Sequence, residues 1–219
     1  MSSGELVGLL WPGLLETLYM TLVSSLFAYV IGLPLGVLLV VMDKDGIHPV
    51  VPVQRVMGVI INLLRSAPFL ILLIAITPMT RAIVGTSVGS TATIVPLVVA
   101  AAPYVARLVE GSLREVDRGV IEAAQSMGAS PMRIIMKVLL PEARPALLTG
   151  CAIAVTTILS YSAMSGIVGG GGLGAIAINY GYYRNNTSIM IVTVILLVVV
   201  VQILQELGML IARTFDKRK

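Results

Sequence analysis

The sequence predicts an all-α integral membrane protein that forms one transmembrane domain over residues 1–219. Of the 219 residues, 57% are hydrophobic and 12% are charged, whereas a soluble domain carries about 25% charged residues. The hydrophobic residues gather in five runs, and a spanning helix needs about 20 mainly apolar residues. Lys and Arg lie mostly at the ends of these runs, as in membrane proteins. We therefore expect spans at residues 14–42, 53–78, 91–109, 146–167 and 188–212.

The first run, residues 14–42, is longer than one crossing requires. It contains Gly32-Leu33-Pro34-Leu35-Gly36. Because a proline inside a helix removes a backbone hydrogen bond, we expect this helix to be tilted or kinked. The four later runs are closer to one crossing in length. The N-terminal region has Glu5 and Glu16 but no Lys or Arg, so no cleavable export signal is expected.

The distribution of Lys and Arg predicts the orientation in the membrane, since short cytoplasmic loops carry an excess of them. One group follows the first run, a second follows the third run, and a third lies in the tail: Lys44 and Arg55; Arg114, Arg118, Arg133, Lys137 and Arg144; Arg213, Lys217, Arg218 and Lys219. The opposite face has Arg81 and Arg184. We expect the N-terminus outside, the C-terminus in the cytoplasm, and the loop of residues 110–144 on the cytoplasmic side.

Composition excludes several functional classes. A single cysteine, Cys151, and a single histidine, His48, supply neither a disulfide, nor a metal cluster, nor a nucleophile with its base. No polar segment reaches the roughly 50 residues of the smallest soluble domains. We therefore expect no catalytic residues and no cofactor in this chain. The formal charge of +4 does not indicate nucleic-acid binding, because the basic residues mark the membrane boundaries.

The loop of residues 110–144 has the pattern of two short helices with a turn between them. Ser130 is a favourable N-cap and Pro131 a favourable first helical residue, so a helix is predicted from there through Val138. Gly128 stands at the break, where a positive φ is wanted. Pro141 and Pro145 are expected to interrupt the helix before the fourth span.

Two interpretations of this helical loop follow from the residues alone. Small residues at Ala123, Ala124 and Gly128 permit close backbone approach to a partner, and Met127 with two further methionines offers adaptable apolar contact. The other interpretation is an ordinary amphipathic surface helix whose apolar side chains rest on lipid headgroups.

The order of residues in this loop favours the partner. Glu122-Ala123-Ala124, then Gly128, then Val138-Leu139-Leu140-Pro141 resembles the signature loop of the permease subunits of bacterial ABC importers, with Val138 where those usually have Ile. The resemblance implies that a separate ATPase, which binds ATP and Mg²⁺, contacts this loop. The residues expected to couple the two are Glu122, Ala123, Ala124, Met127, Gly128, Ser130, Pro131, Leu140 and Pro141.

Further segments are similar to the permease subunits of bacterial methionine importers. They include Glu16-Thr17-Leu18, Arg65-Ser66-Ala67-Pro68-Phe69 and Gly171-Gly172-Leu173-Gly174. The resemblance implies the type I importer permease fold, with five spans, in an inner-membrane homodimer. It also implies two ATP-binding cassette ATPase subunits and an extracytoplasmic methionine-binding lipoprotein as partners. The substrate would be methionine, including D-methionine; the alternative is another small amino acid, since Arg-Ser-Ala-Pro is close to the Arg-Gly-Thr-Pro of polar amino-acid permeases.

Four residues are candidates for the translocation path: Arg65, Tyr161, Ser162 and Met164. Arg65 either faces a cavity, where it can bind a solute carboxylate, or anchors the second span at the interface. The glycines 169–172 lack the Lys-Ser/Thr ending of a phosphate loop and are interpreted as a flexible turn after the fourth span. That turn would let the helix end, with Met164, act as an external gate; simple helix packing is the alternative.

Two other function classes place different demands on the sequence. An ion-coupled carrier needs acidic or polar pairs deep in its spans and usually an internal repeat. The predicted spans have almost no such pairs, and no internal repeat is evident in the sequence. A membrane scaffold for a signalling ATPase would hydrolyse ATP in complex but move no solute.

Overall fold

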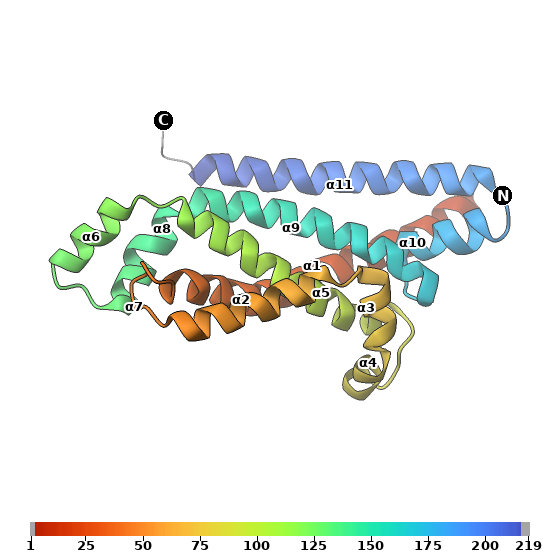
Figure 1. The fold of residues 1–219 in the computed structure, drawn as a ribbon. Coiled ribbons are helices and arrows are strands. Elements are labelled where there is room, and N and C mark those ends of the chain that lie inside the picture. The colour runs from red at the N-terminus through yellow and green to blue at the C-terminus, as the bar shows by residue number, and fades with distance from the viewer. Residues whose placement is uncertain (1–2, 216–219) are drawn as a thin grey trace.

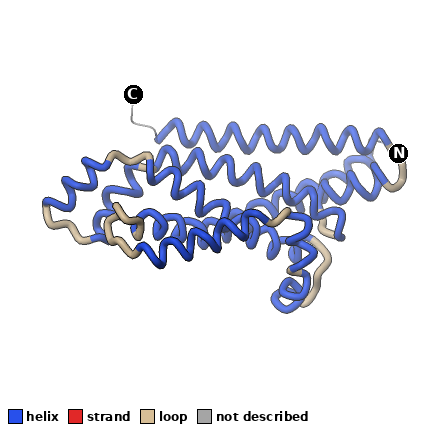
Figure 2. The backbone as a smooth tube through the Cα atoms, viewed as in Figure 1, coloured by secondary structure: helices blue, strands red, loops and turns tan. Residues whose placement is uncertain are grey.

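The computed structural model describes residues 3–215, and within that range every regular element is helical (Figure 2). Four long helices lie along one another (Figure 1): α1 (Ser3–Val41), α5 (Ser90–Arg114), α9 (Arg144–Met164) and α11 (Thr187–Phe215). All four are long and apolar enough to cross a membrane. This part of the predicted all-α membrane fold is confirmed.

The glycines of the first run serve helix packing. α1 continues as one helix through Pro12 and Pro34. A Cβ atom on Gly32 would lie 2.7 Å from the Ala102 carbonyl oxygen, and one on Gly36 would lie 2.6 Å from the Ala106 carbonyl oxygen. The backbones of α1 and α5 therefore approach closely only because these positions have no side chain.

The second run departs from the prediction of one span over residues 53–78. It forms α2 (Val51–Ser66) and α3 (Phe69–Ala75), which are bent by 99° at the break between them. The cause is Pro68, because the residue before a proline is driven out of the α region, and Ala67 has extended φ and ψ of −74° and 126°. Residues 3–215 thus contain four candidate spans, or up to five if the bent pair counts as one.

Short helices close both ends of the bundle (Figure 1). At one end lie α6 (Arg118–Ser126), α7 (Pro131–Ile134), the π-helix η1 (Ile135–Leu139) and α8 (Leu140–Glu142). At the other end lie α4 (Thr77–Val84), the 3₁₀ helix η2 (Ser165–Val168), α10 (Gly172–Ile176) and the π-helix η3 (Ala177–Tyr182).

The largest buried cluster joins α1, α5 and α9. Met20, Leu97, Val105 and Ile158 are among its fully buried members. By contrast α2 buries a single residue, Ile61, and leaves side chains such as Leu63 exposed. Apolar surface of this kind suits lipid or a second protein chain. The bundle core is therefore α1, α5 and α9, with α2 attached at its side.

Candidate functional site

The turn predicted at Gly128 is confirmed. Asp117 is the N-cap of α6, and its side-chain oxygen accepts a hydrogen bond from the Gly119 backbone N–H at 2.7 Å. It ends with two bonds typical of a left-handed C-terminal turn: Ala129 N–H to Ala124 O at 3.1 Å and Gly128 N–H to Gln125 O at 2.9 Å. Gly128 has φ of +75°, so a glycine occupies the position whose backbone conformation favours glycine.

The second helix of the loop begins at Pro131 as predicted, although the Ser130 side chain makes no capping hydrogen bond. The predicted helix does continue through Val138, but Ile135–Leu139 is a π-helix and not an α-helix. Pro141 supplies the reason, because it has no N–H to donate to the carbonyl four residues earlier. The chain widens instead, and the Leu140 N–H bonds to the Ile135 carbonyl. Pro141 therefore changes the helix type, and the chain turns at Ala143 before α9.

The predicted coupling residues divide between two faces of this segment, which we call the coupling element (α6 to α8). Ala124 is buried against its own chain, together with Ile134 and Leu139. Exposed side chains include three methionines: Met127 is 81% exposed, Met132 67% and Met136 55%. Glu122, Ala123, Ser130, Pro131 and Pro141 are also exposed, and Leu140 is half-buried. One face thus holds the element in place, and the other offers an adaptable apolar surface.

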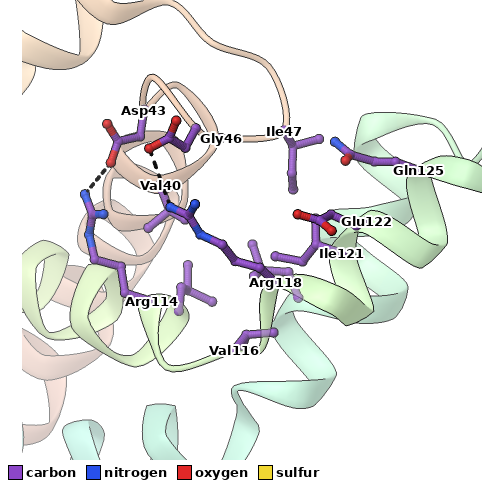
Figure 3. Close-up of a pocket in the computed structure, with 13 residues that line it drawn as sticks. Val40, Asp43, Gly46, Ile47, Arg114, Val116, Arg118, Ile121, Glu122 and Gln125 are labelled. Carbon is purple, nitrogen blue, oxygen red and sulfur yellow. Dashed lines mark hydrogen bonds and ion pairs between the residues drawn. The ribbon is translucent and has the colours of Figure 1, made fainter.

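A cavity of about 340 Å³ lies between the coupling element and the loop that joins α1 to α2 (Figure 3). Two ion pairs cross this region, Arg114 Nη2 to Asp43 Oδ2 at 2.7 Å and Arg118 Nη2 to Asp45 Oδ2 at 3.6 Å. The hydrogen bond from Arg114 holds the pKa of the Asp43 carboxyl below its usual range. Sequence reasoning used these arginines only as markers of orientation and missed their partners.

A second feature that sequence reasoning missed lies inside α5. Arg107, Glu110 and Arg114 follow one another at intervals of three and four residues, so they share a helix face. Glu110 is 7% exposed and pairs with both arginines. The third run was predicted to end at residue 109, between these charges, and the spacing of the three residues was the available signal.

Arg65 and Tyr161, two of the four predicted path residues, come together at one cavity of about 170 Å³. The Arg65 guanidinium lies 6.0 Å from the centre of the Tyr104 ring. Tyr161 stacks on Phe69, with ring centres 4.7 Å apart and planes 7° apart. The cavity thus combines a cation with aromatic walls, next to the bend between α2 and α3.

The other two predicted path residues lie elsewhere. Ser162 is 1% exposed, and its hydroxyl donates to the Leu159 carbonyl at 2.7 Å, so it packs inside the bundle. Met164 is 47% exposed and lines an apolar groove between α9 and α11.

The glycine turn after α9 is tied to α1. Glu16 Oε2 accepts a hydrogen bond from the Gly172 N–H at 2.7 Å, and the Thr17 hydroxyl accepts one from the Leu173 N–H at 2.8 Å. Gly169 and Gly172 have φ of +82° and +81°. These contacts anchor both α10 and the end of the turn.

The chain is similar to known transport proteins over almost its whole length. Residues 30–218 match the model of the family described as binding-protein-dependent transport system inner membrane component. The probable D-methionine transport system permease protein MetI of Vibrio cholerae is 50% identical over 203 residues, which is 93% of this chain and 90% of that protein. The D-methionine transport system permease protein MetI of Escherichia coli K12 is 51% identical over 164 residues, or 75% and 76% of the two chains.

Solved structures of transporter chains are also similar to this chain. A chain of the MetNI methionine ABC transporter in an inward facing conformation superposes with a TM-score of 0.97 at 48% identity, covering 99% of this chain and 100% of that one. A chain of an amino acid ABC transporter crystallised with histidines matches with a TM-score of 0.79 at 22% identity, and covers 95% and 94% of the two chains. At that identity the second likeness shows the fold alone.

Proposed function

Because the chain belongs to the family of binding-protein-dependent transport system inner membrane components, we propose that it carries methionine across the inner membrane. It is a permease subunit of an ABC importer and has the type I importer permease fold. The observation that carries the choice of methionine is the 50% identity, over 93% of this chain, to a D-methionine permease. ATP and Mg²⁺ are bound by a partner ATPase, and this chain contributes the membrane path.

The coupling element is the surface on which the ATPase acts. Its exposed methionines, Met127, Met132 and Met136, form an adaptable apolar contact of the kind that fits a groove on a partner. Its inward face, with Ala124 and Leu139, joins that contact to the bundle. A movement of the ATPase can therefore reach α5 and α9 through these buried contacts.

The assembly is a homodimer that is bound by two ATPase subunits on the cytoplasmic side and by a methionine-binding lipoprotein on the outer side. The N-terminus lies outside and the C-terminus inside. Two features support this orientation: Lys and Arg are concentrated near the coupling element, and the end of α11 lies at the same end of the bundle as that element (Figure 1).

The solute passes the cavity of Arg65, Tyr104 and Tyr161. The Arg65 cation can hold the carboxylate of an amino acid, and the stacked Phe69 and Tyr161 rings favour an apolar side chain beside it. Met164 lies on α9 beyond this cavity and narrows the path as an external gate, whereas the buried Ser162 stays out of the path. A carboxylate and an apolar side chain on one solute are the features of methionine.

The test is uptake by proteoliposomes that contain the permease and its co-expressed ATPase. Labelled D-methionine, L-methionine and other amino acids are compared, each with its binding protein outside and ATP inside. Uptake of methionine that requires both supports the proposal. Uptake driven by an ion gradient without ATP would establish a secondary carrier, and ATP hydrolysis without uptake would establish a scaffold.

A further inference from the structure

The buried carboxylate of Glu110 holds two arginines at once. Glu110 Oε2 accepts a hydrogen bond from Arg107 Nη1 at 2.5 Å. Glu110 Oε1 accepts from Arg114 Nε at 3.2 Å and from Arg114 Nη2 at 2.9 Å. Because Glu110 is 7% exposed, its charge has little water to compensate it and depends on these partners.

Each arginine reaches a different part of the chain from Asp43 to Asn62. Arg107 Nη2 donates to the Gly58 carbonyl oxygen and to Asn62 Oδ1 on α2, both at 2.9 Å. Arg114 Nη2 donates to Asp43 Oδ2 at 2.7 Å, in the loop before α2. Glu110 therefore sets the position of two side chains that bind α2 and its preceding loop to α5.

Few other contacts fix α2 to α5. Ile61 is the one buried residue of α2, and it packs with Ala106 of α5 and half-buried Met57. Apolar packing of this extent can slide, since it is not directional. The hydrogen bonds of Arg107 define one register of α2 against α5.

Stability alone gives a weak reason for these charges. Arg107 Nε is buried and has no hydrogen-bond partner in the structure, and a buried ion pair often contributes less than apolar residues of similar volume. A polar network that is incompletely satisfied is costly in a membrane-spanning helix. Its geometry instead suits a mechanical role between two helices.

The network lies between the two functional regions of the chain. α5 ends at Arg114, and α6 of the coupling element begins at Arg118. Asn62 precedes Arg65 by three residues on α2, about one turn from the cavity that Arg65 lines. A displacement of the coupling element moves α5 directly. It reaches α2 through the contacts between α5 and α2, and through the ion pair of Arg118 with Asp45 in the loop before α2.

We propose that Glu110 is a positioning residue for transport, which orients Arg107 and Arg114 so that α2 moves together with α5. This inference rests on the proposed function, because it assumes an ATPase that displaces the coupling element. Loss of the link leaves ATP hydrolysis in place but uncouples it from the Arg65 cavity. The quantity that changes is the amount of methionine taken up for each ATP hydrolysed.

The test uses the whole permease–ATPase complex in proteoliposomes and measures uptake and hydrolysis in the same preparation. Asn62→Leu keeps the side-chain size but removes one of the two acceptors that α2 offers Arg107, the other being the Gly58 carbonyl oxygen. The position is exposed, so folding is little affected. We expect uptake per ATP to fall at least about threefold, since hydrogen bonds to charged groups are among the stronger ones, with ATP hydrolysis kept within about twofold. Asn62→Asp, which restores an acceptor, should retain the wild-type ratio.

Ser66→Ala is the matched control. It removes one side-chain hydrogen bond of the same helix, from the Ser66 hydroxyl to the Asn62 carbonyl, which stays within α2, and the ratio should not change. Glu110→Gln should lower the ratio further, by about tenfold, because both arginines lose the charge of Glu110 and Arg114 keeps only that of Asp43.

The outcomes separate the two claims. A parallel fall of uptake and hydrolysis in Asn62→Leu, or a ratio equal to that of Ser66→Ala, would overturn the positioning role and leave the network a structural one. Asn62→Leu decides the matter even if Glu110→Gln does not assemble. Failure of the unchanged complex to take up methionine with ATP would refute the proposed function itself.

Discussion

Replacing Gly128 by alanine isolates the energetic cost of one backbone conformation. Gly128 has φ of +75°, and a Cβ atom built there has no heavy atom within 4 Å. Steric overlap with the surroundings therefore contributes nothing. What remains is the left-handed conformation itself, which costs an L-residue about 1–2 kcal/mol.

That free energy acts on the turn between α6 and α7. The hydrogen bonds from Gly128 N–H and Ala129 N–H close this turn, and both are lost if the residue leaves the left-handed region. A penalty of about 1–2 kcal/mol lowers the population of the closed turn by up to about 5- to 30-fold. We expect the affinity for the ATPase, measured by titrating purified ATPase onto immobilised permease, to fall by up to the same factor.

A matched control separates the cost of the left-handed conformation from any loss of affinity caused simply by adding a methyl group. Gly111→Ala introduces the same methyl group into α5, again with no heavy atom within 4 Å but with helical φ, and should leave affinity unchanged or slightly improve helix stability. At position 128, asparagine should bind better than alanine, because it tolerates the left-handed region. Equal affinity for Gly128→Ala and wild type, or alanine equal to asparagine, would refute the reasoning.

Three further predictions follow from the packing and charges. Gly36→Val should separate α1 from α5, because a Cβ atom would lie 2.6 Å from Ala106 O, and overpacking costs about 1–3 kcal/mol; an unchanged melting temperature in detergent would contradict this. Asp43→Asn should remove at most about 1 kcal/mol. The pKa of Asp43 is lowered by Arg114, so this stability difference should be constant above about pH 5 and vanish as pH falls below about 4; a difference that grows in acid would contradict the assignment. Met127→Glu, at an 81% exposed position, should weaken ATPase binding without lowering the melting temperature, whereas a parallel loss of both would indicate a structural role.

Local signals explain which predictions succeeded. The turn at Gly128 and the helix start at Pro131 depend on residues that are neighbours in the sequence, so the local sequence was enough to predict both. The long spans follow from hydropathy for the same reason. The π-helix before Pro141 was missed because a proline can kink, end or widen the preceding helical turn. Tertiary packing decides which of these occurs.

Contacts between distant residues could not be predicted from local patterns. The bond from Arg114 to Asp43 joins residues 71 apart, and that from Arg107 to Asn62 joins residues 45 apart. A hydropathy window also averages across Pro68, so the bend between α2 and α3 was hidden inside an apolar run. The restriction that a proline imposes on its predecessor was the signal that would have revealed it.

Two attachments of α2 to α5 determine how α2 can move. Arg107 bonds to Gly58 near the middle of the helix and to Asn62 in its second half, and near its end Arg65 lies over the ring of Tyr104. Both attachments reach α5, on which Tyr104 and Arg107 are one turn apart. Beyond the bend, however, Phe69 of α3 stacks on Tyr161 of α9. Because α3 contacts α5 as well as Tyr161 of α9, a shift of α5 relative to α9 changes the shape of the cavity of Arg65 and Tyr161, which lies at the bend of 99° between α2 and α3.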